Sequence, residues 1–208
     1  MADSVVSLNQ IQLDALREIS SIGVGNAVTA LAQFVDKKVE MAPPQALIAT
    51  KNEVPKLVPD ENTAITMVGL EMLGEVCGHI LLVFEDKNAL SLVDLLMGRK
   101  PGSAGATLSE IDISALKEVA GVMSGSYLRV LGDMINKTLK MTPPFFDFGA
   151  PTKIPEFIAA HSLEEGEVTV CLKSDFWIIE GKTKVCGQII FIPLAINLRP
   201  LLKLLGME

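Results

Sequence analysis

An internal repeat constrains this chain more than any other feature of its sequence. Residues 14–19 (DALREI) and 114–119 (SALKEV) match in identity or in side-chain chemistry at every position. The same offset of 100 residues relates the Met-Ala-Pro-Pro run at 41–44 to the Met-Thr-Pro-Pro run at 141–144. A unit repeated in this way folds into similar substructures, so the two halves are expected to share one architecture.

Towards the end of each half the offset between the copies grows. Residues 77–80 (CGHI) correspond to residues 186–189 (CGQI), which lie 109 positions further on. The second half therefore holds an insertion of about nine residues. We expect it in the polar stretch 161–165 or at the turn around Gly181 and Lys182.

Each half contains the same order of predicted elements. Apolar residues at helical spacing predict long helices over 8–36 and 108–136. A Ser or Thr followed three residues later by Gln or Glu predicts a capping box at each helix start. The predicted capping pairs are Ser7 with Gln10 and Thr107 with Glu110. Extended stretches with Pro-Pro pairs, two strand-like runs and a final amphipathic helix follow. In the first half these four elements lie, in order, at 38–50, 63–70, 76–84 and 86–98. In the second half they lie at 139–150, 167–173, 184–193 and 195–206.

These elements predict an α/β protein of the α+β type. Two α-β-β-β-α repeats, residues 1–100 and 101–208, are expected to form a single domain over 1–208 with a pseudo-two-fold axis. Their strands would join one largely antiparallel sheet, with the two long helices packed beside it. We expect Gly23 to face the core and permit close helix packing, and Phe34 and Met134 to lie on the core faces of the helices.

Charge and cysteine content exclude several classes of function. The net charge of −7 and the absence of a basic cluster argue against nucleic-acid binding. Residues 19–35 are uncharged, but polar side chains interrupt them, which indicates a buried helix rather than a membrane span. The three cysteines have no CxxC spacing, and neither histidine has metal ligands nearby in the sequence. Reduced thiols and no secretory signal predict a cytoplasmic protein without a metal of its own.

Opposite its core side, each long helix presents a narrow stripe of polar residues and glycines. The positions of this stripe lie within about 60° of one another around the helix axis. The first motif face consists of Asp14, Glu18, Ser21 and Gly25, and the second of Ser114, Glu118, Gly121 and Gly125. A lone glutamate on a helix surface is ordinarily a solvated charge. The glutamate persists in both copies, however, while a nearby surface position differs (Thr29 against Arg129). We therefore interpret these faces as docking surfaces for another protein.

The spacing of these residues resembles a family signature. The family pattern is Asp or Ser, three residues, Glu, two residues, Asn, twenty-two residues, Pro. The first copy presents Asp14, Glu18, Ser21 and Pro44, and the second Ser114, Glu118, Gly121 and Pro144. With the duplication, this pattern resembles the CheC/CheX/FliY family of chemotaxis phosphatases, and the CheC type most.

This resemblance implies docking on a phosphorylated, CheY-like response regulator and faster hydrolysis of its aspartyl phosphate. The regulator would supply Mg²⁺ and a lysine, so no cofactor is expected on this chain. The motif glutamate would engage that lysine, and the asparagine amide would orient the attacking water. Such catalysis works by positioning, which is where phosphoryl transfer gains most.

This chain departs from the family pattern at the water-positioning residue. Ser21 replaces the asparagine in the first copy, and Gly121 replaces it in the second. A serine hydroxyl reaches less far than an amide, and glycine offers no side chain. We therefore expect weak catalysis through Glu18 and Ser21, and docking alone through Glu118. Asn26 lies about 140° around the helix from Ser21, poorly placed to substitute.

Other functions remain open at this point. The chain can instead be a non-enzymatic scaffold related to flagellar-switch middle domains, which binds a response regulator or the receptor deamidase CheD. Dimerisation through an exposed sheet edge is compatible with either function.

Overall fold

The predicted long helices form at equivalent positions of the two halves. In the computed structural model, α1 spans Gln10–Val35 and α3 spans Glu110–Ile135, each 26 residues long. Both end at a residue with left-handed backbone, Asp36 (φ 51°) and Asn136 (φ 53°). The structure describes residues 8–50, 52–57, 63–100, 102–103, 105, 107–154 and 168–207. The 100-residue offset of the sequence is thus preserved from the first turn of each helix to its last.

The helix starts differ from the predicted capping boxes. Asn9 caps α1, and its side chain accepts a hydrogen bond from the Gln12 backbone N–H at 2.9 Å. Ser109 caps α3 in the same way, with Asp112 as the reciprocal partner. The prediction of Thr107 with Glu110 is therefore wrong by two residues, and Ser7 lies outside the described residues. Asn and Ser rank above Thr as N-caps, and here both caps have the extended backbone that the position requires.

A single antiparallel sheet of eight strands holds the two halves together, as predicted. Its order is β1-β7-β8-β4-β3-β5, with β2 also pairing β7 and β6 also pairing β3. The strands are β1 (Lys38–Met41), β2 (Gln45–Thr50), β3 (Ile65–Leu73), β4 (Gly78–Glu85), β5 (Lys140–Met141), β6 (Phe145–Gly149), β7 (Val168–Glu180) and β8 (Thr183–Pro193). The remaining helices are α2 (Asp86–Leu96), α5 (Ala195–Leu204) and the short 3-10 helix η1 (Val54–Leu57).

The first strands of the two halves are exchanged, which the repeat pattern alone does not predict. β1 and β2 of the first half pair with β7 of the second half, and β5 and β6 pair with β3 of the first half. Strands β4 and β8 meet at the centre. Each predicted extended stretch, 38–50 and 139–150, is two short strands rather than one. The Pro-Pro pairs lie in the gaps, where a missing backbone N–H breaks no ladder bond.

The insertion in the second half is divided between two places. Met72 pairs with Gly78 across the β3–β4 hairpin, and Phe176 pairs with Gly187 across the β7–β8 hairpin. The first pair is six residues apart and the second eleven, so five of the additional residues lengthen the β7–β8 hairpin around Gly181. The other four precede β7. The predicted alternative at 161–165 lies outside the described residues.

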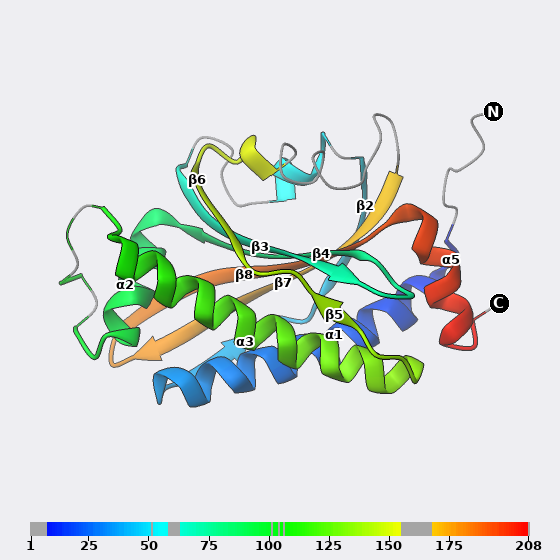
Figure 1. Cartoon of the computed structure of the whole chain (residues 1–208), viewed down its shortest axis with the longest axis horizontal. Helices are drawn as coiled ribbons and strands as arrows, with labels where there is room; N and C mark the ends of the chain where they lie inside the picture. Colours follow the sequence, from blue (N-terminus) through cyan, green and yellow to red (C-terminus); the bar gives the residue numbers. More distant parts are fainter. Residues whose placement is uncertain are drawn as a thin grey trace.

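Helices α1 and α3 lie side by side on one face of the sheet (Figure 1). The core between them and the sheet contains Leu16, Leu31 and Leu116, all at most 2% exposed. Gly23 faces this core, as predicted, and a Cβ there would lie 2.7 Å from the Tyr127 ring. Phe34 and Met134, however, are 42% and 39% exposed, so their predicted core positions are wrong.

A second apolar cluster covers the opposite face of the sheet. It joins Val54 of η1 and Ile154 to sheet residues such as Met67 and Ile190. None of the helices within the described part of the chain has the length and hydropathy needed to cross a bilayer.

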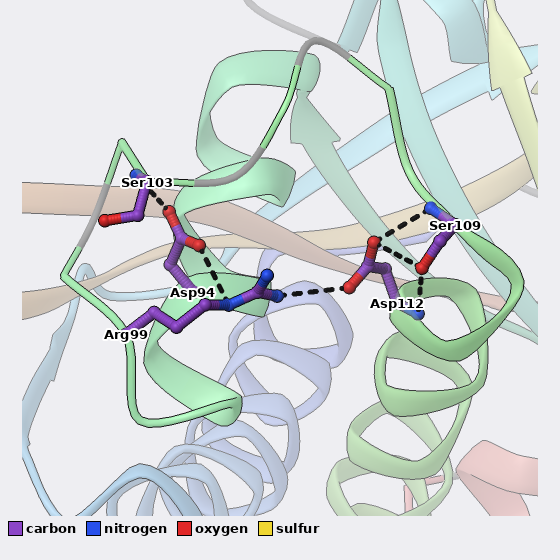
Figure 2. A network of polar contacts seen from close by, with 5 residues as sticks. All are labelled: Asp94, Arg99, Ser103, Ser109 and Asp112. Carbon is purple, nitrogen blue, oxygen red and sulfur yellow. Dashed lines mark hydrogen bonds and ion pairs between the residues drawn. The ribbon is translucent and has the colours of Figure 1, made fainter.

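An ionic network fastens the connection between the halves to the start of α3 (Figure 2). Asp94, at the end of α2, is fully buried and accepts a hydrogen bond from the Ser103 backbone N–H at 2.7 Å. Arg99 lies 3.3 Å from Asp94 and 3.2 Å from Asp112. Hydrogen bonds from Ser109 and the Arg99 guanidinium lower the pKa of Asp112. The ionised Asp112 carboxylate contributes its full stabilisation when the pH is above 3.8, the ordinary pKa of an aspartate. This stabilisation is lost as the pH falls through the lowered pKa of the folded protein.

Replacing Arg99 by alanine is expected to lower the free energy of unfolding by about 1–3 kcal/mol, because a buried carboxylate loses its cation. The measurement is urea denaturation at neutral pH. Arg17→Ala is the matched control, since the Arg17–Asp14 pair is exposed on both sides and contributes at most about 0.5 kcal/mol. Equal losses in the two variants would contradict a structural role for Arg99.

Candidate docking faces

The first motif face projects from the outward side of α1. Asp14 and Glu18 are exposed, while Ser21 and Gly25 are partly buried. Asp14 accepts hydrogen bonds from the Gln10 amide at 2.9 Å and from Arg17 at 2.7 Å. Glu18 makes no hydrogen bond or ion pair with any other described residue. Its carboxylate is thus available to a partner.

The surface of α1 one turn beyond Ser21 is open. A Cβ built on Gly25, one turn further along α1, would meet nothing within 4 Å. Asn26 donates its side-chain amide to the Ile22 carbonyl at 2.9 Å. It is therefore bound to its own helix, in agreement with the expectation that it does not replace the missing motif asparagine.

The second motif face has the same layout on α3 with a closer neighbour. Glu118 is exposed, and it too makes no ion pair or hydrogen bond among the described residues. Ser114 donates its hydroxyl to the Glu110 carbonyl at 2.9 Å. A Cβ on Gly121 would lie 3.9 Å from Pro144 Cγ, and one on Gly125 would lie 3.5 Å from Met141 Cε.

The motif proline of the second copy lies beside the position of the missing asparagine. After α3 ends, the chain turns back along the helix, so that Pro144 stands beside Gly121. The distance of 3.9 Å is ordinary van der Waals contact, so an asparagine would fit at this position as far as its Cβ is concerned. Gly121 is therefore not required by packing.

Apolar residues on the same outward faces escaped the sequence analysis. Ile11 and Ile111 are each 70% exposed, and Ile22 and Val122 are each 39% exposed. On α1, Ile11 and Ile22 lie within about 40° of Glu18, one on either side of it along the helix. The sequence could have indicated them, because both copies have an apolar residue at positions on the outward side of the helix. These residues place apolar surface beside the motif glutamate, and protein interfaces combine apolar and polar groups in this way.

The two motif faces can bind and orient but contain few groups for chemistry. The first has two carboxylates, Asp14 and Glu18, and the hydroxyl of Ser21, and the second has one carboxylate, Glu118, and the hydroxyl of Ser114. No cluster of three or more His, Cys, Asp or Glu side chains suited to a metal ion occurs in the described ranges. The arrangement fits a surface that acts on another protein's reactive group.

Comparison with known proteins agrees with this geometry. Residues 11–48 match the CheC-like family. The flagellar motor switch phosphatase FliY of Bacillus subtilis is 29% identical over 140 residues, covering 67% of this chain and 36% of that protein. The CheY-P phosphatase CheC of the same organism is 27% identical over 139 residues, covering 66% of each chain. Both matches span less than two thirds of the relative's own length.

Solved structures share the fold across nearly the whole chain. FliY from Thermotoga maritima superposes with a TM-score of 0.77 at 20% identity, covering 98% of this chain and all of that one. The FliM middle domain from Helicobacter pylori gives 0.69 at 14% identity, covering 95% and 99%. CheX from Desulfovibrio desulfuricans gives 0.53 at 14% identity, covering 85% and 99%. Motif, fold and relatives agree, and the resemblance predicted from the sequence is confirmed: the chain is similar to members of the CheC-like family.

Proposed function

We propose that this protein docks on a phosphorylated, CheY-like response regulator and weakly promotes hydrolysis of its aspartyl phosphate. The observation that carries the proposal is the pair of equivalent glutamates, Glu18 and Glu118. Both are exposed, neither makes an internal ion pair in the described structure, and exposed apolar residues flank both. Two named relatives, FliY and CheC of B. subtilis, are phosphatases, and CheC acts on CheY-P.

The first face would carry the chemistry. Glu18 would pair with a cation at the regulator's active site, and the Ser21 hydroxyl would hold the attacking water less firmly than an amide. The regulator would supply Mg²⁺ and the phosphoryl group, so that catalysis consists of orienting a water. The second face, with Gly121 in place of asparagine, would dock without activating water.

The decisive assay measures phosphate release from a phosphorylated CheY-like regulator with and without the protein. Wild type should accelerate the decay modestly, and Glu18→Ala should remove most of that acceleration, because the anchoring charge is lost. Glu180→Ala is the matched control: it deletes the same charge at the end of the β7–β8 hairpin, in an exposed pair with Lys37. An unchanged decay rate with wild type would refute the enzymatic proposal.

A non-enzymatic scaffold is the second candidate, and the absence of the motif asparagine from both copies favours it. The fold is shared with FliM middle domains, and one FliM structure is a complex with FliG. Binding of the regulator, or of the deamidase CheD, without faster phosphate release would support this function. Calorimetric titration with each protein distinguishes these partners, and analytical ultracentrifugation tests for a homodimer.

A further inference from the structure

A groove of about 570 Å³ lies beside the second motif helix, between the C-terminal half of α3 and the segment that leads into β5. It begins at Gly125, the last residue of the second motif face. Its walls contain three cationic side chains, Arg129, Lys137 and Lys140, and one acidic side chain, Asp133. The lining therefore carries a net positive charge in a protein whose overall charge is −7.

The unequal hairpins explain why the groove occurs in the second half. In the first half, the long β7–β8 hairpin provides a pairing strand along all four residues of β1, from Lys38 to Met41. In the second half, β3 ends at Leu73, so that β5 is paired only through Lys140 and Met141. The residues between α3 and β5 thus have no paired strand beside them, and the groove forms along this segment.

Two of the three cations lack an internal counter-charge. Lys137 pairs with Glu75 at 2.6 Å. Arg129 and Lys140 are exposed, and no acidic group among the residues placed by the structure lies within 4.0 Å of either. Single exposed cations are ordinarily solvated. Two unpaired cations along one hollow instead form a positive site.

The equivalent positions of the first half are chemically different and internally bonded. Thr29, in place of Arg129, donates its hydroxyl to the Gly25 carbonyl at 2.7 Å. Glu40, in place of Lys140, accepts a hydrogen bond from the Trp177 indole at 2.9 Å. The first half thus provides an internal comparison. At the same two positions of the same fold, its side chains are uncharged or acidic and form hydrogen bonds within the protein.

We propose that this groove binds an acidic segment of a partner polypeptide. Arg129 offers a planar guanidinium fork that matches carboxylate geometry, and Lys140 adds a second positive charge. Leu128 and Met141 give the lining an apolar portion for an aliphatic side chain between the acidic ones. The inference does not depend on phosphatase activity at the motif faces.

The test uses the full chain and a short fluorescent peptide of glutamate and leucine residues, followed by anisotropy. We expect saturable binding that weakens with salt, and weaker binding of the same peptide with glutamine in place of glutamate. The double variant Arg129→Glu/Lys140→Glu should reduce affinity by about tenfold or more, because two charge-assisted contacts become repulsive.

The double variant Lys100→Glu/Lys182→Glu makes the same change in net charge at exposed positions outside the groove. Its affinity should stay within about twofold of wild type, because neither lysine lines the groove and exposed charges that make no direct contact are weakened by salt screening. Equal weakening in both double variants would mean a general charge effect and would overturn the proposal. So would equally tight binding of the glutamine peptide, or tighter binding of a single-stranded oligonucleotide of similar length.

Discussion

Replacing Ser21 by asparagine is expected to raise the rate of phosphate release from a phosphorylated response regulator by about two orders of magnitude. The substitution restores the one group of the family motif that the first face lacks, beside the exposed Glu18. An amide reaches further than a hydroxyl and offers a donor and an acceptor on separate atoms, so under the proposed function it would orient the attacking water more firmly. The measurement is single-turnover decay of the phosphorylated regulator at saturating protein.

Two matched variants make this expectation specific. Ser21→Ala should give no gain, because it offers no hydrogen bond to water. Gly121→Asn tests the second face, where the added Cβ would lie 3.9 Å from Pro144 Cγ, at ordinary contact distance. If Ser21→Asn leaves the rate unchanged while binding persists, the docking geometry itself has diverged from that of the phosphatases, and the scaffold function is favoured.

Replacing Gly23 by alanine is expected to destabilise the protein by about 1–3 kcal/mol, because the added methyl group overpacks the core. Its Cβ would lie 2.7–2.9 Å from three atoms of the Tyr127 ring, which is fully buried. Burial also raises the pKa of the Tyr127 phenol above its ordinary value. The phenol is therefore neutral at physiological pH and stays neutral into the alkaline range. Thermal or urea unfolding measures the change.

Gly25→Ala, on the same helix, is expected to stabilise the protein instead. A Cβ there meets nothing within 4 Å, so alanine only reduces the entropy of the unfolded chain and should stabilise by about 0.4–1 kcal/mol. The two glycines are two residues apart and face opposite ways. Destabilisation by both substitutions, or by neither, would contradict the assigned packing of α1 against α3.

The sequence was sufficient to predict what is periodic or repeated. The long helices and the antiparallel sheet follow from helical spacing and from the 100-residue offset, which Asp36 and Asn136 still mark at the helix ends. The exact caps did not follow, because Asn9 and Ser109 compete with other good cap residues within two positions. Which of these neighbouring residues becomes the N-cap depends on how the first turn of the helix packs against the rest of the protein.

Two features required three-dimensional structure. Exchange of the first strands depends on which hairpin each strand can reach, and no local pattern in residues 38–50 specifies the partner. The exposed pairs Ile11/Ile111 and Ile22/Val122 read as core residues in a simple hydrophobicity count. The roles of Glu18, Ser21 and Glu118 stay predictions, which the phosphate-release assay tests.

The exchanged strands also determine when the fold can form. Glu40 pairs with Trp177, and Gln45 pairs with Lys173, so β1 and β2 have no sheet partner until most of the chain has been synthesised. Contacts of this sequence separation impose a large loop-closure cost and slow folding. During translation the first half exposes two unpaired strands and an uncovered β3 edge. These surfaces are where premature association between nascent copies would begin.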